Sequence, residues 1–245
     1  MRPWWPGRAY RLRRRTWQAL PRGCRERLRR VLAGLARRRR AALRVPLSLA
    51  RLVVLDLETT GLRTEHDRVI AIGAVAVRAR SLRHDDCFDR VLRQARSSPA
   101  ANILIHRIGG QAQLAGGDPV ETLVDFLEYL GDSVLLAFRA EFDAAFLLRE
   151  CALLLGIAPP LQLIDLAAIL PALFPGTQNV TFEDWTGFLG LGGANRHHAV
   201  ADAYLAAEML LMALDRAIGL GLHTTAEIPG IERAHQWLGS SHFRA

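Results

Sequence analysis

Apolar residues after residue 50 first come in short, closely spaced runs, and these runs predict three consecutive strands. Residues 52–57 form an almost continuous apolar run, which is typical of a strand buried on both faces. A second apolar run covers residues 69–77, with Gly73 inside it, and a more polar run over residues 86–92 predicts a third, half-exposed strand. Because the links between the runs are short, we expect an antiparallel meander.

Beyond residue 100 the pattern changes to helical periods that alternate with two further apolar runs. Asp118 is a typical capping residue before Pro119 at the first helical position, and Gly156 and Gly219 are typical of helix ends. The predicted helices cover residues 100–108, 119–130, 141–155, 166–173, 181–189 and 199–218, and the predicted strands cover residues 133–138 and 161–164. Three antiparallel strands followed by alternating strands and helices predict an α/β fold with a mixed sheet.

The two ends of the chain do not share this α/β pattern. Residues 23–43 predict a basic amphipathic helix that ends before Pro46, and residues 220–245 show no clear period and predict a loosely packed tail. The apolar positions of the helix follow a spacing of i, i+3, i+4 and i+7: Leu28, Val31, Leu32 and Leu35. We therefore expect an N-terminal extension over residues 1–50, a folded domain over residues 51–219 and a C-terminal tail over residues 220–245.

Charge separates the extension from the folded domain. Residues 1–51 contain 17 arginines and one acid, a net charge of +16, whereas the other residues contain 15 arginines and 23 acids, a net charge of −8. Four aromatic residues lie among the first arginines: Trp4, Trp5, Tyr10 and Trp17. Such an arm is typical of a segment that contacts nucleic acid or a membrane surface. The chain has no lysine, which fits the mutational bias of a GC-rich bacterial gene, so a solvated or partner-docking helix is the alternative.

Composition places the chain among ordinary globular proteins. Half of its residues are hydrophobic, and its 245 residues are enough for one domain plus an extension. No apolar run reaches the ~18–20 residues of a membrane-spanning helix. The three cysteines, Cys24, Cys87 and Cys151, have no metal-ligand spacing, and their odd number argues against a disulfide framework. We therefore expect a reducing, cytoplasmic compartment.

Four acidic residues and a histidine occur where a predicted strand ends or a predicted helix begins: Asp56, Glu58, Asp143, Asp202 and His197. Asp56 and Glu58 are two residues apart on a strand, so their side chains point to the same face. Each acid alone has a plainer explanation. Strand ends are often polar, and an acid in the first turn of a helix interacts favourably with the helix dipole. Gathered together, four carboxylates would repel one another unless cations neutralise them, and such oxygen-rich sites suit Mg²⁺ or Mn²⁺.

The spacing of His197 and Asp202 predicts where each residue lies. Five residues correspond to a rotation of about 140° on a regular helix, which would put the two side chains on different faces. We therefore expect His197 in the loop before the last helix and Asp202 in the first or second turn of that helix. Imidazole titrates near neutral pH, so a loop histidine can act as a general base. His198 is the alternative base.

Three segments together resemble the ExoI, ExoII and ExoIII motifs of the DnaQ-like, or DEDDh, exonucleases, a family that includes the epsilon proofreading subunit of bacterial DNA polymerase III. They are residues 56–61 (Asp-Leu-Glu-Thr-Thr-Gly), residues 141–143 (Glu-Phe-Asp) and residues 197–203, which match the pattern His-x-Ala-x-x-Asp-Ala. The segments occur in the family's order, and the resemblance covers roughly residues 51–219. It implies a ribonuclease H-like fold, in which a mixed five-stranded sheet is flanked by helices.

The resemblance also implies a chemistry and a set of substrate contacts. It implies that two Mg²⁺ or Mn²⁺ ions are held by the four carboxylates and that His197, rather than His198, is the general base. In the family, the acid matching Glu58 also faces the 3′-hydroxyl of the substrate. The implied substrate contacts are Thr59, Thr60, Leu62, His106 and Phe142. For His106, a surface histidine at a helix end is the plainer alternative.

This sequence departs from the family pattern at two places. Phe138 and Arg139 stand where a His-Asn pair is frequent, and Arg107 replaces a glycine that usually follows the histidine of the groove. None of these positions supplies a metal ligand, so metal binding should survive, whereas substrate preference and rate could change. Arg139 could instead contact a phosphate.

We predict a metal-dependent 3′–5′ exonuclease that releases nucleoside 5′-monophosphates from single-stranded 3′ ends, with DNA as the substrate. An exoribonuclease acting on RNA ends or oligoribonucleotides is the alternative within the fold. A non-catalytic nucleic-acid-binding module is the alternative from another class, and the complete set of acids plus His197 argues against it. Because the chain has no polymerase-length extension, proofreading would need a DNA polymerase, or another replication or repair protein, in trans.

Overall fold

A computed structural model describes residues 14–42, 45–161, 163–177, 181–192, 197–228 and 230–231, with the backbone alone for residues 35–42. Three of the aromatic residues of the predicted arm, Trp4, Trp5 and Tyr10, lie outside the described residues, as does the side chain of Leu35. Within the described ranges, no helix is both long enough and apolar enough to cross a membrane.

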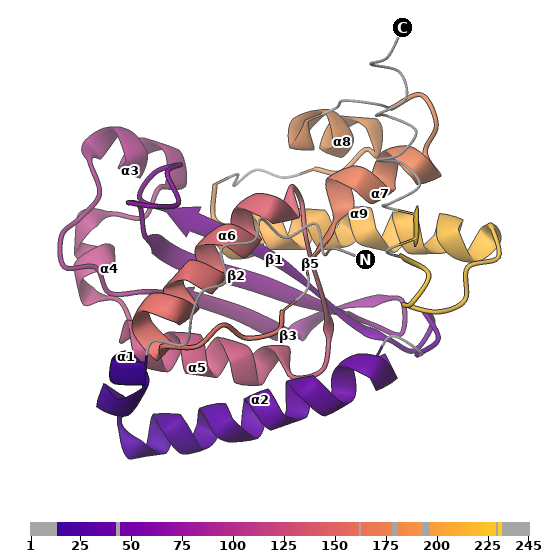
Figure 1. Cartoon of the computed structure of the whole chain (residues 1–245). Coiled ribbons are helices and arrows are strands. Elements are labelled where there is room, and N and C mark those ends of the chain that lie inside the picture. Colours follow the sequence, from indigo (N-terminus) through magenta and orange to yellow (C-terminus); the bar gives the residue numbers. More distant parts are fainter. Residues whose placement is uncertain are drawn as a thin grey trace, which may run out of the picture.

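The described part of the chain contains one mixed sheet of five strands in the order β3-β2-β1-β4-β5 (Figure 1). The strands are β1 (Arg51–Thr59), β2 (Val69–Arg78), β3 (Ser81–Val91), β4 (Val134–Ala137) and β5 (Leu163–Asp165). The first three strands pair antiparallel, whereas β4 pairs parallel with both β1 and β5. This confirms the predicted α/β class and mixed sheet. The third strand begins earlier than predicted because Ala79 and Arg80, both with positive φ, turn the chain directly from β2 into β3.

The helices follow the predicted positions closely, with two short additions. They are α1 (Arg14–Ala19), α2 (Arg22–Ala42), α3 (Ala100–His106), α4 (Gly110–Ala115), α5 (Pro119–Leu130), α6 (Ala140–Glu150) with a π-helical turn η1 (Cys151–Leu155), α7 (Leu166–Leu173), α8 (Phe182–Phe188) and α9 (Ala199–Gly219). The sequence predicted neither α1, which lies before the predicted basic helix, nor α4, because glycines flank α4 and suggest turns. Its Gln113 is fully buried and donates to the carbonyl of Ile108 at 2.8 Å, which holds this short helix in place.

Alternate residues of β1 point into two separate cores, one on each face of the sheet. Val53 and Leu55 pack with residues of α5 and α6, whereas Leu52 and Val54 pack with residues of α7, α8 and α9. Figure 1 shows the same layers, with α9 across one face and α5 and α6 on the other. This explains the continuous apolar run of residues 52–57, since a strand covered on both faces has no polar side.

The basic helix α2 packs against the outer side of α5 and extends the core on that face (Figure 1). Leu20, Cys24 and Leu28 are buried among residues of the same cluster as α5. One arginine, Arg27, contacts three acids of α5: Glu121 at 2.9 Å, Asp125 at 2.5 Å and Glu128 at 2.5 Å. Hydrogen bonds to Glu128 and Asp125 hold the pKa of Arg27 above its usual value. The described part of the basic extension is therefore fixed to the acidic domain.

The first residues after α9 are also packed, although the sequence shows no period there. The Leu47 N–H donates to the carbonyl of His223 at 2.8 Å, and the Thr225 N–H donates to the carbonyl of Val45 at 3.2 Å. Ile228 is buried in the core beneath α9. Hydrogen bonds to the segment before β1 order these residues. The hydrophobic pattern of the C-terminal segment alone does not show this partner. Up to residue 228, the segment after α9 is therefore packed and is not the loose tail that the sequence predicts.

Replacing Leu28 with alanine is expected to destabilise the protein by about 2–5 kcal/mol, the usual cost of truncating a buried leucine. Leu28 has no exposed surface, so the change leaves a cavity between α2 and α5. Urea unfolding followed by tryptophan fluorescence measures the effect. Arg30→Ala, at an exposed position of the same helix, is the control and should change stability by less than about 0.5 kcal/mol. Equal stability of the two variants would contradict the packing of α2.

Candidate active site

Three of the four predicted acids come together at the end of β1. Asp56, Glu58 and Asp202 each offer one carboxylate oxygen, and these oxygens all lie within 4.8 Å of one another. Asp56 and Glu58 share a face of β1, as their spacing predicts, and Asp202 comes from the first turn of α9. Asp202 and Glu58 are buried, at 6% and 9% exposure, so water screens their charges poorly.

A glycine in β2 allows α9 to bring Asp202 to this position. Gly73 pairs with Asp56 across the sheet. A Cβ atom at Gly73 would lie 2.1 Å from the backbone of Ala199 and Val200, so the start of α9 rests directly on the strand. Any side chain at this position would push the helix, and Asp202 with it, away from the sheet. The sequence signal was a glycine inside an apolar strand, which often marks a close backbone approach.

Asp143 lies beside this group in a more enclosed position. It occupies the first turn of α6 and is 4% exposed. Burial raises its pKa well above the usual carboxyl value, hydrogen bonds from its own backbone N–H and that of Leu57 act in the opposite direction, and the nearby charges of Asp165 and Glu58 raise it further. It therefore interacts with Glu58, although it does not belong to the three-oxygen group. A nearby cation would relieve the cost of keeping Asp143 ionised.

His197 lies in the loop directly before α9, as its spacing from Asp202 predicts. Its backbone has a φ of 65°, which is uncommon for a residue other than glycine. Its N–H donates to Asp202 Oδ2 at 2.9 Å, which ties this loop to one of the three clustered carboxylates. His198 is the exposed residue that precedes the first turn of α9. The geometry thus places the backbone of His197 against Asp202 by a direct hydrogen bond.

The chemistry of this donor set fits hard divalent cations. Its ligand atoms are all carboxylate oxygens, which suit Mg²⁺ and Mn²⁺ rather than a soft metal that prefers sulfur. The oxygen-to-oxygen spacing of at most 4.8 Å in the three-acid group allows a single ion to contact all three residues. Asp143 adds a further carboxylate next to Glu58.

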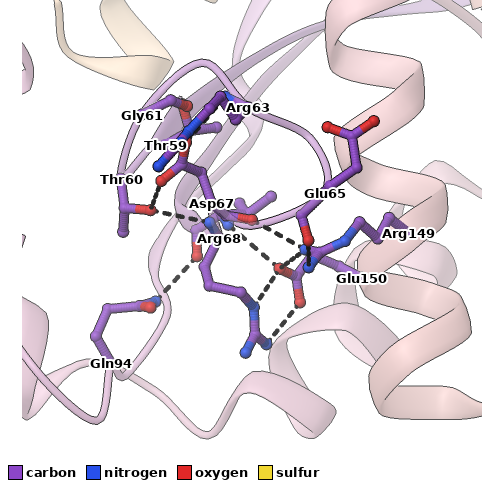
Figure 2. Close-up of polar contacts among 11 residues, drawn as sticks. Thr59, Thr60, Gly61, Arg63, Glu65, Asp67, Arg68, Gln94, Arg149 and Glu150 are labelled. Atoms are coloured by element: carbon purple, nitrogen blue, oxygen red, sulfur yellow. Dashed lines mark hydrogen bonds and ion pairs between the residues drawn. The ribbon is translucent and has the colours of Figure 1, made fainter.

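The loop after β1 carries two of the predicted substrate residues, Thr60 and Leu62, and is held by its own polar contacts (Figure 2). Thr60 Oγ1 donates to Asp67 Oδ1 at 3.1 Å, and the Arg63 N–H donates to Asp67 Oδ2 at 2.9 Å. A Cβ atom at Gly61 would lie 2.6 Å from the same carboxylate, so only glycine fits there without a shift. Leu62, at the tip of the loop, is 82% exposed.

Two residues at the end of α6 anchor this loop from below (Figure 2). Glu150 is 1% exposed and accepts two hydrogen bonds from Arg68, at 2.6 and 2.8 Å. The neighbouring Arg149 donates to the carbonyls of Asp67 and Glu65, at 2.9 and 2.7 Å. Since Asp143 lies at the other end of α6, one helix supports both the loop and the carboxylate. Sequence reasoning missed this anchor, because an Arg-Glu pair on a helix is usually a solvated surface pair.

The other predicted substrate residues have different surroundings. Thr59 Oγ1 donates to the carbonyl of Gly61 at 2.7 Å, and Asn102 on α3 donates to the carbonyl of Thr60. Phe142 is half-buried and packs against Phe146, with the ring centroids 4.8 Å apart. Direct contact of these residues with substrate stays a prediction.

His106 is buried, so the plainer alternative of a surface histidine is wrong. It is 2% exposed, and both ring nitrogens have partners: Nε2 lies 3.0 Å from Ser98 Oγ, and Nδ1 accepts from the Ile108 N–H at 3.1 Å. Burial lowers its pKa, which favours the neutral ring. The structure thus gives His106 a role in fixing the turn after α3, and a direct substrate contact would require this network to open.

Asp165 joins the elements around Asp143, which sequence reasoning did not foresee. Its Oδ1 accepts from the N–H of Ala167 at the start of α7 and from the N–H of Arg139 before α6, both at 2.9 Å. Burial raises its pKa above the usual carboxyl value, while the hydrogen bonds from backbone N–H groups and the charge of Arg139 partly offset this shift. Asp165 thereby fixes the start of α6, and with it the position of Asp143.

Comparison with known proteins gives an exonuclease family and relatives among the DNA polymerase III proteins. A family model described as RNase_T, exonuclease, matches residues 53–210. The chain is 27% identical over 181 residues to the PolC-type DNA polymerase III of Caldanaerobacter subterraneus, covering 73% of this chain and 13% of that protein. It is 28% identical over 171 residues to the DNA polymerase III subunit epsilon of Buchnera aphidicola, covering 66% of this chain and 72% of that protein. The chain thus spans a small part of the PolC-type relatives.

Solved structures share the fold at lower sequence identity. The nuclease domain of 3′hExo, described as a DEDDh family member bound to rAMP, has a TM-score of 0.61 and 17% identity, covering 68% of this chain and 92% of that chain. Exonuclease X, in complex with 5′ overhanging duplex DNA, has a TM-score of 0.56 and 21% identity, covering 74% of this chain and 99% of that chain. Both confirm the predicted ribonuclease H-like architecture.

Proposed function

The chain belongs to the RNase_T exonuclease family, and we propose that it is a metal-dependent 3′–5′ exonuclease that releases nucleoside 5′-monophosphates from nucleic-acid 3′ ends. One observation carries this proposal: the oxygens of Asp56, Glu58 and Asp202 lie within 4.8 Å of one another. The segments that carry these acids resemble the family's motifs. A relic of the fold that only binds nucleic acid would have no need to keep this repulsive cluster.

In the proposed mechanism the acids form the cation site and His197 moves a proton. Asp56, Glu58, Asp143 and Asp202 would hold two Mg²⁺ or Mn²⁺ ions, which neutralise charge and act as Lewis acids when bound. The backbone of His197 is tied to Asp202, and its imidazole would accept a proton from the attacking water. The water oxygen attacks the terminal phosphorus, the bond from phosphorus to the 3′-oxygen breaks, and that oxygen takes up a proton.

We propose DNA as the substrate and a polymerase as a partner in trans. The support is that the related proteins named above are DNA polymerase III proteins, one of them a separate epsilon subunit. RNA is the second candidate, favoured by the structural likeness to a nuclease domain bound to rAMP. The three cysteines form no disulfide, which supports the proposed cytoplasmic location.

The proposal is tested with purified protein and 3′-labelled single-stranded DNA and RNA of the same sequence. We expect release of nucleoside 5′-monophosphates in Mg²⁺ or Mn²⁺ and no release in EDTA. Faster cleavage of DNA would support the main proposal, and faster cleavage of RNA would support the second candidate. Binding of both oligonucleotides without cleavage in either metal would instead favour the non-catalytic module.

A further inference from the structure

Residues other than glycine with a left-handed backbone gather at the active site. Within the described ranges, five such residues have positive φ, and two of them, Ala79 and Arg80, form the turn between β2 and β3. The other three are Arg107 at 55°, Arg139 at 59° and His197 at 65°. Arg139 lies directly before α6, the helix of Asp143, and His197 lies in the loop before α9, the helix of Asp202, whereas Arg107 ends α3. Uncommon backbone conformations are often retained where the side chain has a function.

Arg139 lies directly before α6, four residues ahead of Asp143. Its N–H donates to Asp165 Oδ1 at 2.9 Å, which holds its backbone beside the buried carboxylates. Its side chain is exposed. A left-handed position favours glycine or asparagine over arginine, so the backbone alone gives no reason for an arginine here.

Arg107 comes from a different part of the chain. It ends α3, with its N–H bonded to the carbonyl of Ile103 at 2.8 Å. The next residue, Ile108, packs in a small cluster with Ala71 and Ala199. Ala71 pairs with Glu58 across the sheet, and Ala199 begins the helix of Asp202. Arg107 therefore lies at the edge of the site, and its side chain is exposed.

Neither guanidinium is engaged in an ion pair with any residue that the structure describes. Other arginines near the site are bound to protein groups, as Arg68 is to Glu150 and Arg149 is to the carbonyls of the loop. The two exposed arginines instead stand in a part of the chain with a net charge of −8. Two exposed cations beside clustered acids suit a ligand that is itself negatively charged.

We propose that Arg107 and Arg139 bind phosphate groups of the nucleic-acid backbone and hold the strand across the acidic site. This inference rests on the proposed function and adds the residues that bind the substrate's backbone. Guanidinium groups pair with phosphate oxygens through two parallel hydrogen bonds. Such contacts do not distinguish one base from another, so they can position any single strand. Because they are ionic, their strength depends strongly on the salt concentration.

The test uses Arg107→Gly and Arg139→Asn, which remove the charge and place a residue that accepts positive φ. Both variants should therefore fold, which their melting curves check. We expect each to weaken binding of a single-stranded oligonucleotide about tenfold. The slope of log affinity against log salt should flatten by about 0.7 for each lost contact.

Arg78→Gln is the matched control and should keep wild-type affinity. Arg78 is an exposed arginine at the last position of β2, whereas Ala71, which pairs with Glu58, lies near the start of that strand. Arg107→Lys and Arg139→Lys should recover part of the salt dependence. Wild-type affinity and salt slope in both charge-removing variants would overturn the proposal. Binding is measured in EDTA, so it does not depend on cleavage. A wild type that binds the oligonucleotide in EDTA but does not cleave it in Mg²⁺ would overturn the proposed function alone. A wild type that neither binds nor cleaves would overturn both.

Discussion

Replacing Asp56 or Asp202 with asparagine is expected to lower the cleavage rate by more than about 10³-fold, since even groups that only support a metal ligand cost 10–100-fold when lost. Asparagine keeps the shape of the side chain but removes the negative charge that the cations require. Asp202→Asn also retains an oxygen that can accept the hydrogen bond from His197, whose N–H lies 2.9 Å from Asp202 Oδ2 in the wild type. The expected loss is therefore one of metal binding and not of loop structure.

Thermal unfolding in EDTA separates this loss from a loss of fold. Without cations, clustered carboxylates repel one another, so removing one of them should not lower the melting temperature. Addition of Mg²⁺ should raise the melting temperature of the wild type more than that of either variant, because a bound ligand stabilises only the protein that binds it. Asp85→Asn, at an exposed position of β3, is the control and should behave as wild type. Turnover near the wild-type rate in either site variant would refute the assignment of these acids.

The sequence was sufficient to predict the elements whose signal is local. The run of residues 52–57, the Asp118-Pro119 start and the glycine stops all lie within the element that they define. Contacts between distant segments were not predictable in this way. The apolar positions of α2 were visible, but that Leu28 packs on α5 depends on a partner about 100 residues away. The packing of Ile228 after α9 has the same origin.

The same distinction separates the predicted from the unpredicted residues of the site. The spacing of Asp56 and Glu58 and that of His197 and Asp202 fixed their relative positions, because both depend on strand and helix geometry alone. The burial of His106 was not predictable, because its partner Ser98 is held by Gln113 of a helix that the pattern did not show. Likewise, Asp165 supports the start of α6 only because β4 and β5 are neighbours in the sheet.

His197→Asn is expected to lower the rate at saturating substrate by about 10²–10⁴-fold, the usual range for loss of a general base. Asparagine tolerates the φ of 65° observed at this position, and its backbone N–H can still donate to Asp202. The variant therefore removes the imidazole while the loop and the acids stay in place. Steady-state kinetics with a single-stranded oligonucleotide in Mg²⁺ measure the loss, and metal binding should be unchanged.

The neighbouring histidine provides the control for this prediction. His198 is exposed, and it precedes α9 at a position where asparagine is a favourable cap. His198→Asn should therefore keep a rate within about threefold of the wild type, since an exposed substitution that preserves the cap has little to disturb. If His198→Asn lost the larger part of the rate and His197→Asn kept it, His198 would be the base. That result would mean that the hydrogen bond from the backbone of His197 to Asp202 serves to shape the loop. The proton of the attacking water would then be accepted by His198.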